Sequence, residues 1–281
     1  MPLYNDSISK VNSIDLHFIQ YENEHPKLLL LHGLTANAFA FNGLIEAGLT
    51  KHFSVISVDQ RGRGLSSKSL ASFSIEDHAL DILELLDFLD IKTIMVCGHS
   101  FGGLLATYLA FHYPKRFSKI TILDAAPQMN PNTPKMLGST LSRLGQSYES
   151  FDVFLSKVKD APYITFWDSA MEAYYNADVE ETEDGGVRSR SSIADIILIS
   201  KAVASEKWEE CFSEMNQPSL LIVAIDNYTM DQPLLPVEQA KTILNKMKAC
   251  TYVEVSGNHQ TMLYGKGAVQ IVDAIVSFAN G

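Results

Sequence analysis

The sequence Gly-His-Ser-Phe-Gly at residues 98–102 combines a hydroxyl with the spacing of a nucleophile turn. It follows a short apolar run, residues 93–97, and opens a helix-like segment that Pro114 ends. A strand that turns sharply into a helix strains its middle residue and projects that side chain above the sheet. The two glycines leave room for the turn, and the helix N-terminus stabilises developing negative charge. We therefore predict that Ser100 is a nucleophile.

The elements around this turn alternate between apolar runs and segments of helical periodicity. Uninterrupted Leu, Ile and Val runs are typical of parallel strands, which are buried on both faces. Segment 14–21 alternates more strongly and is expected in an antiparallel edge pair, and Ser74 is expected to cap a helix with Asp77 at its third position. This order predicts an α/β protein with a mostly parallel eight-stranded sheet and helices on both faces. The other expected strands are 28–31, 53–58, 93–97, 120–123, 220–224 and 251–255, and the expected helices are 39–49, 74–89, 100–113, 237–247 and 266–279.

Segment 127–210 interrupts the alternation. It opens with three prolines and shows helical patterns but no convincing strand. We predict an all-helical lid inserted between strands 6 and 7 of a core domain formed by residues 1–126 and 211–281. Such an insertion lies at the carboxyl ends of parallel strands, where open α/β sheets bind ligands. Its aromatic side chains are predicted to shape a pocket, although each could simply pack the lid on the core. The predicted pocket residues are Phe166, Trp167 and Tyr174.

Three other segments match motifs of one protein family. Residues 31–34, Leu-His-Gly-Leu, resemble a His-Gly loop after the third strand. Residues 59–66 resemble the turn Asp-x-Arg-Gly-x-Gly-x-Ser after the next strand, and Asn258-His259 lies where the family keeps its histidine. With the nucleophile turn, these segments make the chain resemble an α/β-hydrolase-fold protein of the lidded, esterase-like kind over nearly its whole length.

The resemblance implies that His259 is the general base. A neutral imidazole near Ser100 would take its proton and return it to the leaving group. In the family's chain order of nucleophile, acid and histidine, only His112 and His259 follow Ser100, and His112 lies inside the next helix. The chain has Asn-His where the family has Gly-His. The oxyanion would be bound by the backbone N–H groups of Leu34 and Phe101.

The acid that should orient the histidine is ambiguous in this sequence. The family usually supplies it after the seventh strand in a Gly-x-x-Asp pattern, but here Ala224 replaces the glycine and Asn227 the aspartate. Asp226 comes one residue early and Asp231 four residues late, and a one-residue shift in an extended chain turns the side chain to the other face. Asp124 ends the strand beside the nucleophile's strand, where some members carry the acid and others a structural aspartate. We favour Asp124, then Asp226, then Asp231.

Four arginines could bind an anionic substrate. Arg61 and Arg63 belong to the 59–66 turn, which we expect to brace the loops under the site. Arg188 and Arg190 are better placed for a bidentate contact with a substrate carboxylate. Their ordinary interpretation is as surface partners of the acidic run 180–184.

The overall composition excludes several classes of partner. The 281 residues include 22 Lys and Arg against 33 Asp and Glu, a net charge of −11, with no basic cluster for nucleic acid or anionic membranes. The three cysteines, Cys97, Cys211 and Cys250, are far apart, which argues against a disulfide framework or zinc ribbon. The N-terminus has no pattern of a signal peptide, and no apolar run is long enough to span a bilayer. We expect a cytoplasmic protein.

The predicted activity is acyl transfer by a serine hydrolase on a small ester, thioester, lactone or amide. We expect a small-molecule substrate, no metal or organic cofactor, and a monomer or homodimer. The resemblance leaves carbon–carbon bond hydrolysis and cofactor-free perhydrolysis open on the same residues, while a serine nucleophile argues against haloalkane dehalogenases and epoxide hydrolases. A ligand receptor or signalling protein with little turnover is the alternative from another class. A proline-directed peptidase is a further possibility, for which the insertion has no obvious motif.

Overall fold

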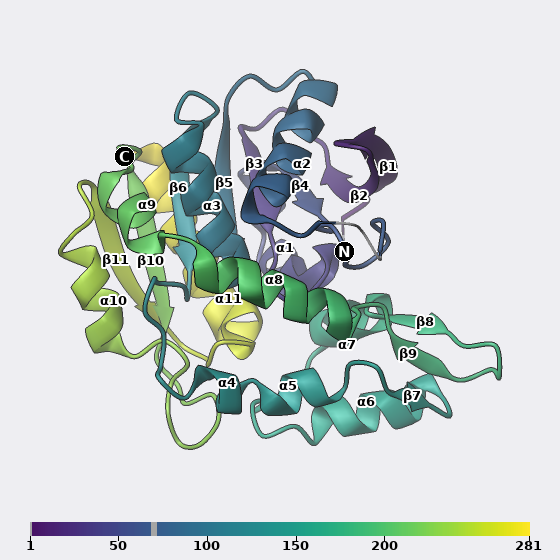
Figure 1. Cartoon of the computed structure of the whole chain (residues 1–281). Coiled ribbons are helices and arrows are strands. Elements are labelled where there is room, and N and C mark those ends of the chain that lie inside the picture. The colour runs from purple at the N-terminus through teal and green to yellow at the C-terminus, as the bar shows by residue number, and fades with distance from the viewer. Residues whose placement is uncertain (1, 69–71) are drawn as a thin grey trace.

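The structure is a computed structural model that describes residues 2–68 and 72–281 (Figure 1). Within these residues the main sheet has eight strands, which are β1 (Asn5–Val11), β2 (Ile14–Tyr21), β3 (Lys27–Leu31), β4 (Ser54–Val58), β5 (Ile94–His99), β6 (Phe117–Leu123), β10 (Ser219–Ala224) and β11 (Cys250–Val255). Their order across the sheet is β1-β2-β4-β3-β5-β6-β10-β11. Only the β1–β2 and β2–β4 pairs are antiparallel among these described strands. The structure confirms the mostly parallel sheet and the antiparallel edge.

Helices cover both faces of the sheet. Alternate residues of β3 belong to two separate apolar clusters: Leu29 and Leu31 pack with α2 and α3, whereas Leu28 and Leu30 pack with α1 and α11. The uninterrupted leucine run is thus explained by burial on both sides. The helices named here are α1 (Asn42–Glu46), α2 (Ile75–Phe88), α3 (Phe101–His112), α10 (Val237–Leu244) and α11 (Gly265–Asn280), with 3₁₀ turns at Ala38–Phe41, Leu49–Lys51 and Thr261–Leu263.

The start of α2 follows the sequence prediction closely. Ser74 Oγ accepts a hydrogen bond from the Asp77 N–H at 3.0 Å, and the Asp77 carboxylate accepts one from the Ser74 N–H at 3.1 Å. This reciprocal pair satisfies two N–H groups that the first helical turn leaves without partners.

Most of the chain between β6 and β10, residues 133–189, forms a second group of elements at the lower end of the view in Figure 1. The prediction that this insertion is all-helical was wrong, because β7, β9 and β8 form a small antiparallel sheet in that order. Strands of two or three residues are too short to show an alternating pattern in sequence. The elements are α4 (Thr133–Met136), α5 (Gly138–Ser142), β7 (Ser147–Tyr148), α6 (Phe151–Lys159), α7 (Ser169–Ala177), β8 (Val179–Glu181), β9 (Val187–Ser189), α8 (Ile193–Ser205) and α9 (Trp208–Glu214).

Helix α9 belongs with the elements of the main sheet. It packs against α3 and α10, and Trp208, Cys211 and Phe212 are buried there. The expected boundary between residues 210 and 211 therefore falls inside a helix. A division placed before Trp208 would keep this helix whole.

None of the helices in the described part of the chain has both the length and the apolar character needed to cross a bilayer.

Candidate active site

Ser100 lies in a strained turn between β5 and α3. Its backbone has φ 54° and ψ −119°, a region that residues with a side chain rarely adopt. A Cβ atom on Gly98 would lie 2.0 Å from the Gly102 oxygen, and one on Gly102 would lie 1.9 Å from the Leu31 oxygen. Both positions therefore require glycine. The Ser100 N–H donates to the Leu123 oxygen at 2.9 Å, which fixes the turn beside the end of β6.

Asp124 and His259 form a buried pair next to this turn. His259 Nδ1 lies 2.7 Å from Asp124 Oδ2, and Asp124 Oδ1 accepts a hydrogen bond from the Ala224 N–H at 3.0 Å. The side chains of Asp124 and His259 are 1% and 8% exposed, so water does not compete for this contact. Because a carboxylate only accepts hydrogen bonds, Nδ1 carries the proton and Nε2 is free to accept one.

The loop that carries His259 is tied to the nucleophile turn through His99. His99 Nε2–H donates to the His259 carbonyl oxygen at 2.8 Å, and the two rings lie 4.7 Å apart. Burial, together with the neighbouring imidazole, lowers the pKa of His99 well below its ordinary value, so His99 acts as a neutral donor. No hydrogen bond joins Ser100 Oγ to His259 within the described residues. Such bonds are often long without substrate and tighten in the Michaelis complex.

Of the three candidate acids, the structure brings only Asp124 to the imidazole among the residues it describes. Asp226 is exposed, and its Oδ2 accepts a hydrogen bond from the Gly257 N–H at 2.9 Å. It therefore holds the histidine loop from the outside. Asp231 is exposed in a turn in which Met230 and Asp231 both have positive φ.

Two backbone N–H groups lie at the turn without an acceptor. Among residues 2–68 and 72–281, neither the Leu34 nor the Phe101 N–H donates to another residue. The Leu34 loop passes close to the nucleophile, because a Cβ on Gly33 would lie 3.5 Å from Ser100 Cβ. Free N–H groups beside a nucleophile can bind the oxyanion of an acyl-transfer reaction.

The His-Gly loop is held from below by buried polar contacts. His32 Nδ1–H donates to the Gly33 oxygen at 2.7 Å, while Nε2 accepts from the Gln60 N–H at 3.1 Å. Burial is the main cause that lowers the pKa of His32 to about 4. A second ring proton, on Nε2, would face the Gln60 N–H. Asp59 Oδ1 accepts from the Ala38 N–H at 2.6 Å. These contacts fix the loop that contains Leu34.

The arginines of the 59–66 turn have structural partners. Arg61 makes a bidentate contact with Asp81, with Nε–Oδ2 at 2.7 Å and Nη2–Oδ1 at 2.6 Å. Arg63 is fully buried and lies 5.5 Å from the centre of the Phe101 ring. Both therefore brace the turn, as the sequence led us to expect.

Asn258 explains how the chain departs from Gly-His at this position. Its Oδ1 accepts from the N–H groups of Gln260 and Thr261, both at 3.0 Å, and its Nδ2 donates to the Tyr163 oxygen at 2.8 Å. The side chain is fully buried. Asn258 thus links the histidine loop to the insertion, which a glycine could not do.

The predicted pocket aromatics lie in three different environments. Phe166 is exposed and its ring lies against Gly265, at the start of α11. Trp167 stacks on Tyr175 with ring centres 5.6 Å apart, and Tyr174 is buried beside it. Phe166 and Trp167 line surface hollows whose described walls do not include Ser100 or His259.

Two other tyrosines stand closer to the base. The Tyr228 ring meets the His259 ring edge-on with centres 5.7 Å apart, and Tyr163 stacks on Tyr228 at 5.0 Å. Sequence analysis did not single out Tyr228 as a site residue. Its place in the loop after a predicted strand, at the carboxyl edge of the sheet, could have identified it.

The surface arginines of the insertion pair with the acidic run. Arg188 Nε lies 3.0 Å from Glu180 Oε1, and Arg190 Nη1 lies 3.6 Å from Glu180 Oε2. Arg188 is more than half exposed. These contacts match the ordinary interpretation of the two residues.

Comparison with known proteins places the chain in a family. The family model for the alpha/beta hydrolase fold matches residues 26–183, more than half of the chain. The 2-(acetamidomethylene)succinate hydrolase of Mesorhizobium japonicum is 24% identical over 208 residues, which cover 73% of this chain and 72% of that protein. The 3-oxoadipate enol-lactonase 2 of Acinetobacter baylyi is 33% identical over 106 residues, 38% of this chain and 39% of the relative.

Other matches are shorter or show the fold alone. An uncharacterized protein of Mycobacterium bovis is 35% identical over 100 residues, so the match spans 36% of this chain and only 29% of that relative. A crystal structure of E-2-(acetamidomethylene)succinate hydrolase has a TM-score of 0.86 at 20% identity and covers 99% of this chain and 100% of its own. The lactonase and the succinate hydrolase among these relatives are hydrolases, and the chain belongs to the alpha/beta hydrolase fold family.

Proposed function

We propose that this protein is a serine hydrolase in which Ser100, His259 and Asp124 act as nucleophile, base and orienting acid. The observation that carries the proposal is the buried 2.7 Å contact between His259 Nδ1 and Asp124 Oδ2 beside the strained Ser100 turn. This contact leaves Nε2 as the proton acceptor, which is the tautomer that a serine nucleophile requires. Two relatives are named as an enol-lactonase and as a 2-(acetamidomethylene)succinate hydrolase, and these names support the reaction class.

In the proposed reaction, Ser100 Oγ attacks the acyl carbonyl carbon while its proton passes to His259 Nε2. The N–H groups of Leu34 and Phe101 bind the oxygen that becomes negative. The tetrahedral intermediate collapses, and the leaving group takes the proton from His259. Water then attacks the acyl-enzyme with His259 as base, which releases the acid and restores Ser100.

The substrate class proposed is a small ester, thioester, lactone or amide. The insertion between β6 and β10 is proposed to act as the lid, because Tyr163 from the insertion and Tyr228 from the β10 loop stack beside His259. Aromatic walls of this kind favour small, partly apolar acyl groups. Turnover of such compounds separates this proposal from a ligand receptor on the same fold.

A fluorophosphonate probe with intact-mass detection tests the proposal. We expect one adduct on the wild type, and none on Ser100→Ala. The adduct should form far more slowly on His259→Ala, because the serine loses its base. Labelling of the folded Ser100→Ala variant at the wild-type rate would refute the assignment of the nucleophile. A folded wild type that gives no adduct would refute the hydrolase itself.

A further inference from the structure

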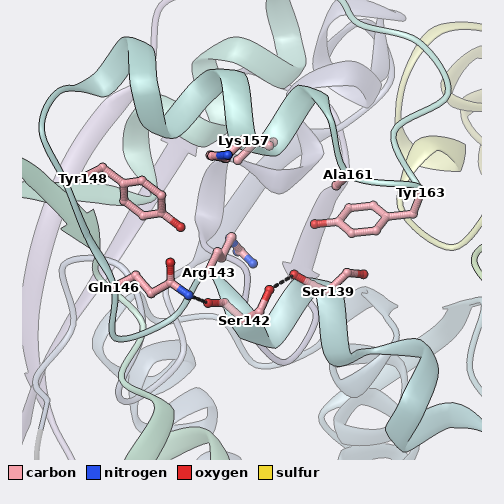
Figure 2. A pocket seen from close by; sticks show the side chains of 9 residues that line it. Ser139, Ser142, Arg143, Gln146, Tyr148, Lys157, Ala161 and Tyr163 are labelled. Carbon is pink, nitrogen blue, oxygen red and sulfur yellow. Dashed lines mark hydrogen bonds between the residues drawn. The ribbon is translucent and has the colours of Figure 1, made fainter.

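A polar cavity lies within the insertion, between α5 and α6 (Figure 2). Its volume is about 190 Å³, which exceeds the ~150 Å³ of an apolar protein cavity known to admit benzene. Its walls include two serines, two tyrosines, a glutamine and two cations, Arg143 and Lys157. A cavity of this size and chemistry suits a small anionic group better than an apolar one.

The Arg143 guanidinium in this cavity is buried and incompletely paired. Its side chain is 8% exposed. Its Nη1–H donates to the Thr140 oxygen at 3.0 Å, while the only acidic side chain paired with it among described residues, Asp178, is 3.4 Å from Nη2. The buried Nε has no hydrogen-bond partner in the described part of the chain. A buried donor without an acceptor is unfavourable, so the guanidinium keeps hydrogen-bonding capacity that its protein partners do not use.

Asp178 does not saturate this cation. Its Oδ2 also accepts a hydrogen bond from Ser189 Oγ at 3.2 Å. Burial raises the pKa of Asp178 even beside Arg143, so the pair does not fully compensate the loss of water. Lys157, exposed on α6, adds a second positive charge and has no acidic partner among the described side chains.

The cavity shares a wall with the proposed active site. Tyr163 lines the cavity and stacks on Tyr228, whose ring edge meets His259. Thr140 joins the same residues, because its carbonyl accepts from Arg143 and its hydroxyl lies 2.6 Å from the Tyr228 hydroxyl. Figure 2 shows Arg143 between Tyr148 on one side and Tyr163 on the other. One stacked pair of rings, Tyr163 and Tyr228, therefore connects the wall of this cavity to His259.

We infer that this cavity is a carboxylate subsite: the acyl substrate carries a carboxylate a few bonds from its scissile carbonyl, and the incompletely paired Arg143 guanidinium binds that carboxylate. The inference rests on the proposed hydrolase function and narrows its substrate class. The chain carries a net charge of −11, so its overall field repels such a substrate and the attraction must come from local cations.

Two aryl esters of equal chain length test the inference. Mono-4-nitrophenyl glutarate ends in a carboxylate, and 4-nitrophenyl pentanoate ends in a methyl group at the same position. We expect the wild type to prefer the glutarate ester, and the ratio of the two kcat/KM values to fall by ~30-fold or more in Arg143→Met. The matched control is Arg188→Met, which removes an exposed cation of the same insertion and should leave the ratio within about 2-fold.

Because Arg143→Met leaves Asp178 buried without its cation, a second variant protects the test from misfolding. Arg143→Met/Asp178→Asn removes both charges together and should show the same fall in the ratio. An unchanged ratio in both folded variants would overturn the inference.

A binding measurement separates failure of the subsite from failure of the hydrolase. Titration of free glutarate into the Ser100→Ala protein, followed by calorimetry, should show binding that Arg143→Met weakens at least ~10-fold and Arg188→Met does not. Fluorophosphonate labelling without glutarate binding or preference would leave the hydrolase standing and refute the subsite. Arg143-dependent glutarate binding without labelling or turnover would support the carboxylate subsite and refute the hydrolase.

Discussion

The substitution Asp124→Asn tests the orientation of the proposed base most directly. The Ala224 N–H donates to Asp124 Oδ1 at 3.0 Å, so the amide oxygen of an asparagine at this position must occupy the same place. The amide NH₂ group would then face His259 Nδ1, which lies 2.7 Å from the other carboxylate oxygen. The imidazole would have to accept at Nδ1 and carry its proton on Nε2, where it could not take the proton of Ser100.

The size of this effect follows from the tautomer. A wrong tautomer at a serine triad lowers kcat by ~10⁴-fold, which corresponds to about 5 kcal/mol of transition-state stabilisation. The fold should survive, because Asn is nearly the same size as Asp and keeps the hydrogen bond from Ala224. The assay is steady-state hydrolysis of a 4-nitrophenyl ester, with the fluorophosphonate labelling rate as a second measurement.

The matched control is Asp226→Asn. Asp226 is exposed and contacts the Gly257 N–H, so its neutral variant should retain kcat within about 3-fold. The reverse pattern, with activity lost in Asp226→Asn and kept in Asp124→Asn, would refute the reasoning. It would require the loop after β10 to rearrange when substrate binds.

Three further predictions concern stability. Gly102→Ala should lower the free energy of unfolding by ~3 kcal/mol or more, because its Cβ would lie 1.9 Å from a backbone oxygen of β3. Gly138→Ala has open space around its Cβ and should raise the free energy of unfolding by about 0.5 kcal/mol. Equal urea midpoints for the two variants would contradict the packing argument. Burial lowers the pKa of His32 from 6.5 to about 4, so the folded state favours the neutral ring: this stability is fully present above pH 6.5 and falls by roughly 3 kcal/mol on acidification to pH 4. Between pH 7 and pH 4 the free energy of unfolding, measured with urea, should therefore depend less on pH in His32→Gln than in the wild type. Parallel curves for the two proteins would contradict the role given to His32. Asn258→Ala leaves the buried Tyr163 oxygen and two N–H groups without a partner and should lower the free energy of unfolding by about 1–3 kcal/mol, whereas a change below ~0.5 kcal/mol would show that water replaces these bonds.

Local features of the fold could be predicted from the sequence. The Ser100 turn depends on glycines within two residues, and the β3 leucine run reports burial on both faces. The three short strands of the insertion could not be predicted, because two or three residues show no period. Their pairing depends on the hairpin that joins β8 to β9.

The candidate site depends on contacts between residues far apart in the sequence, which limits how much of it the sequence can predict. The Asp124–His259 contact joins residues 135 positions apart, and the sequence could only rank Asp124 above its rivals. In the described part of the chain, the cavity beside Arg143 is lined by residues 139–163 alone, but its link to the proposed base depends on the contact between Thr140 and Tyr228 of the β10 loop. No local sequence pattern predicts that these residues come into contact, since each residue would be equally acceptable on an exposed helix or loop.

The position of Asp124 directly after β6, together with its contact to His259, has a consequence for how such a protein can diversify. The loop at residues 225–231 follows β10. If Asp124 orients His259, this loop takes no part in proton transfer. It nevertheless carries Tyr228, which forms the boundary between the base and the cavity of the insertion. Mutations in this loop could therefore change which molecules are accepted while the reaction chemistry stays intact. Loop and insertion together would form a unit that can be exchanged between relatives, and directed evolution could target that unit first.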